Sequence, residues 1–129
     1  MTTPQSPAGR SVLVAEDEPT TRNLLNLFLS ERGFQVFGAG TATEALEICR
    51  RDQPAIILID ADFSTPRGGL RLLADLRATR PGVRLCLMSG GGTFAVEELE
   101  LLGAAAFLAK PFTIDLLLQV LEALGGGPG

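Results

Sequence analysis

The feature that most constrains this chain is a run of five apolar residues, Ala-Ile-Ile-Leu-Ile at positions 55–59, which ends abruptly at Asp60. A strand with one solvated face would alternate apolar and polar side chains, whereas this run is apolar on both faces. Strands of this kind occur where helices cover both sides of a parallel sheet. We therefore predict a central parallel strand at residues 55–59.

Strand and helix signals alternate along the rest of the chain. Thr41, with Glu44 three residues later, has the spacing of a capping box, and Pro19 suits the first position of a helix. Further strands are predicted at residues 11–15, 34–36, 83–88 and 105–109, and helices from Pro19 to Gly33, from Thr41 through 49, across 70–76, across 94–102 and from Thr113 through 121. Five βα units in succession imply a parallel sheet between two layers of helices.

The length of 129 residues and the apolar share of 46% fit one globular domain. We expect that domain at residues 10–124, with flexible tails at 1–9 and at the glycine-rich 125–129. No apolar run approaches the roughly 18 residues that a membrane span needs. Because the N-terminus also lacks the apolar stretch of a secretory signal, we expect a cytoplasmic protein with no membrane partner.

Composition excludes several classes of function. Fifteen acidic against eleven basic residues give a net charge of −4, which argues against a nucleic-acid-binding groove. The chain has no His, Trp or Tyr, so histidine bases, histidine metal ligands and most aromatic stacking platforms are unavailable. Cys49 and Cys86 lie far apart in apolar segments and are interpreted as small core residues.

Polar side chains follow four of the predicted strands. Glu16 and Asp17 follow the first, and Asp60, Ser89 and Lys110 end the third, fourth and fifth. The carboxyl ends of parallel strands meet at one edge of the sheet, which is where ligands bind in such folds. Carboxylates held close together repel one another unless a cation joins them, and oxygen ligands suit Mg²⁺. The pattern therefore predicts a magnesium site beside a lysine, an arrangement suited to phosphoryl transfer onto an aspartate.

These segments resemble the receiver domain of bacterial two-component response regulators. The resemblance covers nearly the whole chain, residues 11–124, and its motifs lie at 12–19, 54–60, 87–90 and 105–112. It implies a flavodoxin-like (βα)5 three-layer sandwich with a five-stranded parallel sheet in the order 2-1-3-4-5. It also implies a signalling protein rather than an enzyme. Since 129 residues leave no room for an output domain, we expect a stand-alone regulator.

The resemblance assigns a role to each residue of the acidic edge. Asp60 would accept phosphate from a histidine kinase or a histidine phosphotransfer protein. Asp17 would bind Mg²⁺ (or Mn²⁺) directly and Glu16 directly or through water. Asp60 would also be a metal ligand, and the backbone carbonyl of Asp62 would complete the metal site.

Three further residues are assigned from the fourth and fifth strands. Lys110 and Ser89 would bind phosphoryl oxygens, and Ser89 would move toward the phosphoryl group on activation. Phe107 occupies the position of an aromatic that rotates with this residue in the family. It is interpreted either as that switch or as a packed side chain.

Apolar residues outside the helix faces that are predicted to pack on the core suggest a second functional surface. Leu101 in the fourth helix, and Leu116 and Val120 in the last, indicate either a wide buried stripe or a docking face. The docking face would comprise the fourth helix, fifth strand and fifth helix, and would bind a downstream target protein or a second copy of the chain.

The sequence departs from the family pattern at three places. Phe63-Ser64 replaces the common Met-Pro, in a loop over residues 63–69 that looks one residue longer. Glu16 replaces the commoner Asp. The glycines at positions 90–92 predict a mobile loop, because glycine loses the most backbone entropy on ordering.

Three alternative functions share some of these features. A receiver that docks a partner without phosphorylation is supported by the unusual loop at 63–69. A haloacid-dehalogenase-like phosphatase would use Asp60 as nucleophile and Asp62 as general acid, but its further acidic motif lies late in the chain, whereas here the acids precede Asp60. A flavin-binding protein of the same topology is disfavoured because Glu16 and Asp17 would repel the flavin phosphate.

Overall fold

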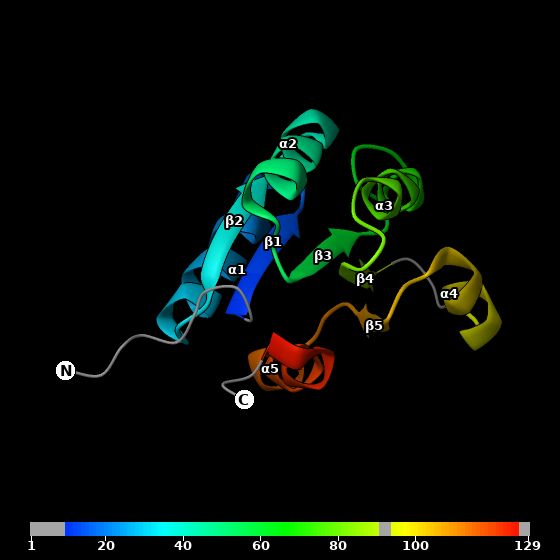
Figure 1. The fold of residues 1–129 in the computed structure, drawn as a ribbon. Helices are drawn as coiled ribbons and strands as arrows, with labels where there is room; N and C mark the ends of the chain where they lie inside the picture. Colours follow the sequence, from blue (N-terminus) through cyan, green and yellow to red (C-terminus); the bar gives the residue numbers. More distant parts are fainter. Residues whose placement is uncertain (1–9, 91–93, 127–129) are drawn as a thin grey trace.

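The computed structural model describes residues 10–90 and 94–126. Strands and helices alternate along the chain (Figure 1). The strands are β1 (Ser11–Ala15), β2 (Gln35–Ala39), β3 (Ile56–Asp60), β4 (Arg84–Ser89) and β5 (Ala106–Ala109). The helices are α1 (Pro19–Glu31), α2 (Ala42–Asp52), α3 (Gly68–Thr79), α4 (Val96–Leu102) and α5 (Ile114–Leu121), the last followed by a π-helical turn, η2 (Glu122–Gly126).

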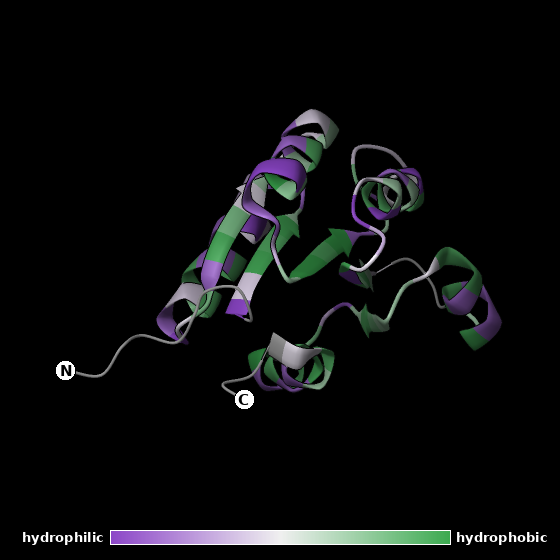
Figure 2. Ribbon diagram, viewed as in Figure 1, coloured by the Kyte–Doolittle hydropathy of each residue, from purple (hydrophilic) through white to green (hydrophobic). Residues whose placement is uncertain are grey.

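The sheet is parallel, and its strand order β2-β1-β3-β4-β5 confirms the predicted 2-1-3-4-5. β1, β3 and β4 are central, and the side chains of β3 are buried throughout, as its apolar run predicted. Odd-numbered β1 and β3 residues such as Leu13 and Ile57 pack with α2 and α3, whereas Val12 and Leu58 pack with α1 and α5. Figure 2 shows the resulting pattern, with strands coloured hydrophobic and helices divided between hydrophobic and hydrophilic residues.

Several predicted element ends are confirmed by hydrogen bonds. Thr41 Oγ1 accepts a bond of 3.1 Å from the Glu44 N–H, as the capping box requires. The reciprocal bond is displaced by one residue, because Glu44 Oε1 accepts from the N–H of Gly40. Gly33 ends α1 with a left-handed φ of 90°, and the next N–H, that of Phe34, bonds the carbonyl of Leu29. Phe34 therefore closes the helix and does not begin β2, contrary to the prediction.

The fourth helix is shorter than predicted and is attached at its ends. Ala95 is extended and its N–H bonds Glu98 Oε1, so α4 begins at Val96 and not at Phe94. None of its side chains is fully buried. The guanidinium of Arg67, just before α3, pairs with Glu98 at 3.3 Å, and Arg77 Nη1 donates 3.0 Å to the carbonyl of Leu102.

The predicted tail at 1–9, most of the glycine run at 90–92 and residues 127–129 lie outside the described residues. At the C-terminus, Gly125 adopts a φ of 91°, which interrupts the helical backbone at the first residue of the predicted glycine-rich tail. Cys49 and Cys86 are fully buried free thiols, as expected for core residues. Among the described helices, none is long and apolar enough to cross a membrane.

Candidate functional site

The register of the sheet brings the polar strand ends to one edge. Ala15, the last residue of β1, pairs with Ile59 next to Asp60, and Asp60 in turn pairs with Met88 next to Ser89. Ser89 pairs with Ala109, and its carbonyl accepts the N–H of Lys110 at 2.8 Å. The acidic, hydroxyl and ammonium groups that the sequence places after separate strands are therefore neighbours on this edge.

Three carboxylates and one ammonium group form the centre of the site. Carboxylate oxygens of Glu16, Asp17 and Asp60 lie within 4.8 Å of one another. Lys110 Nζ lies 3.1 Å from Glu16 Oε1 and 3.4 Å from Asp60 Oδ2. Glu16 is 1% exposed and Asp60 is 8% exposed, whereas Asp17 is open to solvent. The ammonium group of Lys110 thus joins two buried carboxylates, and the third carboxylate, that of Asp17, lies beside them in contact with solvent.

The local electrostatics follow from burial and from these contacts. Burial raises the pKa of Glu16, because it disfavours the carboxylate, and the Glu18 N–H and Lys110 only partly offset this effect. For Lys110, burial opposes the charged form, but the hydrogen bond and attraction to Glu16, together with Asp60, outweigh it and raise the pKa. The ammonium therefore stays charged while it bridges the two acids.

The donor set suits a hard divalent cation. All three clustered groups are carboxylates, and such oxygens are the ligands that Mg²⁺ prefers. The cluster also carries an excess of negative charge over the single contacting lysine, which a divalent ion would neutralise. The residues present at this edge therefore fit the metal that the sequence predicts.

The remaining predicted residues surround this cluster. Ser89 ends β4 and is 5% exposed. The N–H of Asp62 donates 3.0 Å to Asp60 Oδ1, and its own carboxylate accepts the N–H of Arg67. Phe107 is half-buried and meets Phe94 edge to face, with ring centroids 5.5 Å apart. The metal role of the Asp62 carbonyl and the switch role of Phe107 stay predictions.

The unusual loop between β3 and α3 closes over the acidic edge. The N–H of Ser64 donates 3.0 Å to Asp17 Oδ2, a contact between residues 47 positions apart. Ser64 and Arg67 both have left-handed φ, at 69° and 60°, and Phe63 is 3% exposed. Sequence reasoning missed the Ser64 contact, because a backbone donor in a loop leaves no signal in residue type.

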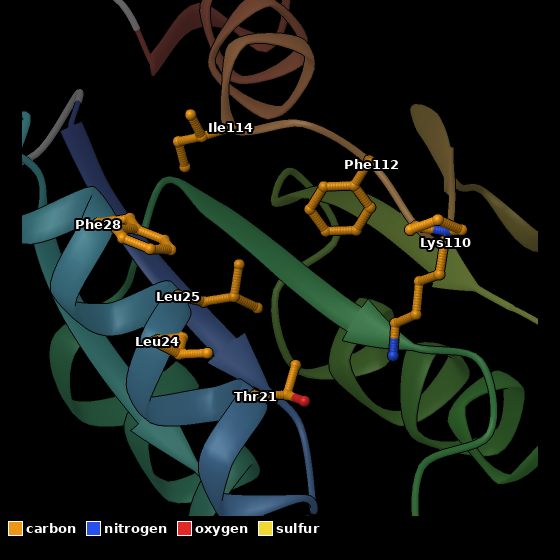
Figure 3. A pocket seen from close by; sticks show the side chains of 8 residues that line it. Thr21, Leu24, Leu25, Phe28, Lys110, Phe112 and Ile114 are labelled. Atoms are coloured by element: carbon orange, nitrogen blue, oxygen red, sulfur yellow. The ribbon is translucent and has the colours of Figure 1, made fainter.

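Sequence reasoning also missed an apolar groove beside the site. The groove has a volume of about 440 Å³ and runs between α1 and the segment after β5. Leu24, Leu25 and Phe28 form one wall, and Lys110, Phe112 and Ile114 form the other (Figure 3). Because Lys110 also contacts Asp60, the groove opens next to the acidic cluster. Leu24 and Phe28 are spaced as i and i+4, and this spacing is equally typical of a helix face that is buried in the core.

The proposed docking face is apolar only in part. Leu101 is 84% exposed and Leu116 is 43% exposed, so both are available on the surface. Val120 is half-buried and packs on the core, which supports the wide-stripe interpretation for that residue. The exposed apolar surface of α4 also includes Val96, at 67%.

A doubly wound α/β sheet with an acidic cluster and a lysine at its carboxyl edge defines the class of this protein. The chain belongs to the response regulator receiver domain family, whose model matches residues 12–122. Receiver domains are signalling proteins that interact with histidine kinases or phosphotransfer proteins and bind Mg²⁺ at an acidic pocket.

Similar proteins include both short and long relatives. The chain is 30% identical to sporulation initiation phosphotransferase F of Bacillus subtilis, over 81% of this chain and 84% of that protein. It is 33% identical to a probable chemotaxis protein CheY of Rhizobium etli, over 89% and 92%. It spans only 55% of the transcriptional regulatory protein PdtaR of Mycobacterium tuberculosis, at 32% identity over 88% of this chain.

Solved structures show the same fold. The receiver domain of NtrX from Brucella abortus matches with a TM-score of 0.78 and 30% identity, over 88% of this chain and 96% of that domain. A response regulator from Burkholderia pseudomallei matches at a TM-score of 0.76 and 28% identity, over 87% and 66%, and its structure holds a phosphorylated aspartic acid, a calcium ion and citrate.

Proposed function

We propose that Asp60 is the phosphoacceptor of a magnesium-dependent signalling switch, phosphorylated by a histidine kinase or a histidine phosphotransfer protein. The observation that carries this proposal is the position of Lys110 Nζ, in contact with Asp60 and Glu16 beside a third acid. A buried carboxylate at the end of a strand, next to a cation and two further carboxylates, is an arrangement for accepting a phosphoryl group.

In the reaction, a carboxylate oxygen of Asp60 attacks the phosphorus atom of the phosphohistidine. The new O–P bond forms as the P–N bond breaks, and the imidazole leaves. The Asp62 N–H holds Asp60 Oδ1 at 3.0 Å and so orients the nucleophile. Lys110 and the hydroxyl of Ser89 bind oxygens of the transferred group. Glu16, Asp17, Asp60 and the Asp62 carbonyl would hold Mg²⁺ or Mn²⁺, which supplies positive charge that offsets the charge of the phosphoryl oxygens.

The groove beside Lys110 gives the phosphodonor a surface next to the acceptor. A donor helix that binds against Leu24 and Phe28 would bring its phosphohistidine toward Asp60, because Lys110 both lines the groove and contacts Asp60. Phe28→Asp should slow transfer from a purified histidine kinase that labels the wild type, while labelling by acetyl phosphate, which needs no docking surface, stays unchanged. Equal slowing with both donors would exclude this docking site.

The signal is proposed to reach a downstream partner through the surface formed by α4, β5 and α5. The exposed Leu101, Leu116 and Val96 provide the apolar contacts of this surface. Movement of Ser89 and Phe107 on phosphorylation would shift a two-state equilibrium there, so that a target protein or a second copy binds one state better.

The proposal is tested by intact mass after incubation with acetyl phosphate and MgCl2. We expect the wild type to gain one phosphoryl group, and both Asp60→Asn and a sample without divalent ions to gain none. Asp62→Asn is the matched control, because it removes a neighbouring exposed carboxylate and should still be labelled. If Mg²⁺ binds but no label is detected, beryllofluoride separates the two explanations: its binding would indicate a phosphoryl group that is lost too quickly to detect, and its failure to bind would indicate a docking module. Sustained turnover of a phosphate ester that depends on Asp62 would indicate the phosphatase.

A further inference from the structure

Arg22 contacts the backbone of the acidic edge, and the proposed function gives it no role. It lies in α1, one turn after the acidic run, and is half-buried. Its Nη1 donates a hydrogen bond of 2.8 Å to the carbonyl oxygen of Glu16. Its own N–H bonds the carbonyl of Glu18, as expected within a helix, so the side chain folds back over the turn that precedes α1.

This hydrogen bond acts on the link between two proposed metal ligands. The carbonyl of Glu16 and the N–H of Asp17 belong to one planar peptide unit, which rotates as a rigid body. The N–H of Glu16 is already fixed, because it donates 3.1 Å to the carbonyl of Ala39 at the end of β2. The N–H of Glu18 in turn holds Glu16 Oε2 at 3.2 Å. With Arg22 on the carbonyl, the backbone on both sides of Glu16 is held, and so is the starting point of the Asp17 side chain.

The end of β2 leaves room for the Arg22 side chain. A Cβ on Gly40 would lie 2.7 Å from Arg22 Nη1 and 3.2 Å from Cζ, and a Cβ on Gly38 would lie 3.4 Å from Arg22 Cδ. Gly40 is not among the glycines with positive φ, so its backbone would accept alanine. Space for the guanidinium, and not conformation, therefore accounts for glycine at position 40.

We propose that Arg22 is a positioning residue that preorganises the acidic cluster for a divalent cation by fixing the Glu16–Asp17 peptide plane. The inference rests on the proposed function, since it needs Glu16 and Asp17 to be metal ligands. Groups that orient metal ligands typically contribute about tenfold or more to metal affinity.

The test is titration of the purified protein with MgCl2 in a calorimeter. Arg22→Met removes the hydrogen-bond donor and keeps much of the length of the side chain. Gly40→Ala leaves Arg22 in place but adds a methyl group after β2 that displaces its guanidinium. We expect both variants to bind Mg²⁺ about tenfold more weakly. Arg22→Lys, which keeps a donor and the charge, should recover much of the affinity. Arg50→Met is the matched control, because it removes the same charge from an exposed position in α2 and should bind as the wild type does.

Labelling with acetyl phosphate separates positioning from general destabilisation. The Mg²⁺ concentration for half-maximal labelling should rise in Arg22→Met and Gly40→Ala, while the rate at saturating Mg²⁺ stays near that of the wild type. Loss of thermal stability without this change in Mg²⁺ dependence would overturn the inference. Wild-type affinity in both variants would also overturn it and would leave the proposed function intact. A wild type that neither binds Mg²⁺ nor is labelled would overturn both.

Discussion

The contact between α3 and the end of β3 allows one substitution to be worked out in detail. The N–H of Gly69 bonds the carbonyl of Ala61 at 2.9 Å, which draws the start of α3 against the end of β3. A Cβ on Gly69 would overlap the carbonyl oxygen of Asp60 and lie 2.9 Å from the Cα of Ala61. Both obstacles are buried backbone atoms, one in the last residue of β3 and one in the residue that follows it, so neither can swing aside as a side chain would.

Gly69→Ala should therefore force the start of α3 away from β3. Overpacking of this kind costs about 1–3 kcal/mol, and the rigid backbone places this case near the upper end. For a chain of this size, a loss of about 3 kcal/mol lowers Tm by roughly 12 °C. The free energy of unfolding can be measured by urea titration and Tm by circular dichroism.

Gly82→Ala is the matched control, since a Cβ there meets nothing within 4 Å. This substitution should leave stability unchanged or raise it by up to about 1 kcal/mol, because alanine restricts the unfolded chain. If Gly69→Ala were as stable as Gly82→Ala, the close approach of α3 to Asp60 would be wrong. The description of the Gly69 contact that holds the start of α3 against β3 would then be wrong as well.

Three further predictions concern the core, the surface and α4. Burial raises the pKa of Cys86 from 9.0 to about 12, so only the unfolded chain ionises this thiol in that pH range. Ionisation of Cys86 alone should lower the free energy of unfolding there by at most about 1.4 kcal/mol per pH unit, so urea titrations should show a shallower fall in Cys86→Val than in the wild type. Leu101→Ser, at an exposed position, should change stability by less than about 0.5 kcal/mol, whereas Leu73→Ala, at a fully buried position of α3, should cost about 2–5 kcal/mol. Similar losses in the two variants would contradict the assigned burial. Arg67→Ala removes an exposed ion pair with Glu98 that contributes about 0–1 kcal/mol. Hydrogen exchange should therefore accelerate in α4 with little change in Tm, and unchanged exchange would show that this pair does not hold the helix.

The fold could be predicted because its signals are local. The apolar run before Asp60 is typical of a strand in a covered parallel sheet, and Pro19, Thr41 and Gly33 mark helix ends through contacts within a few residues. The acidic edge followed from one geometric rule, that parallel strands end on the same side. Lys110 therefore met Glu16 although 94 positions separate them.

The sequence could not predict hydrogen bonds between elements that lie far apart in the chain, because these depend on the exact positions of individual atoms. The Ser64 N–H on Asp17 and the Arg22 guanidinium on the Glu16 carbonyl depend on loop and side-chain paths that residue type does not encode. Val120 was equally ambiguous, because a valine beside a core stripe has the same pattern whether the stripe is wide or narrow. Only its packing against the core decided the matter.

The way α4 is attached has a consequence for how this protein can change over generations. Its side chains are never fully buried, and Arg67 and Arg77 hold its two ends from outside the helix. Substitutions on its outward face are therefore close to neutral for folding, as surface substitutions generally are. The residues of this outward face are also separate from Glu16 and Asp60, which are buried at the ends of the central strands. Mutations can accumulate on this helix and alter which surface is presented, while selection on the acidic edge continues unaffected.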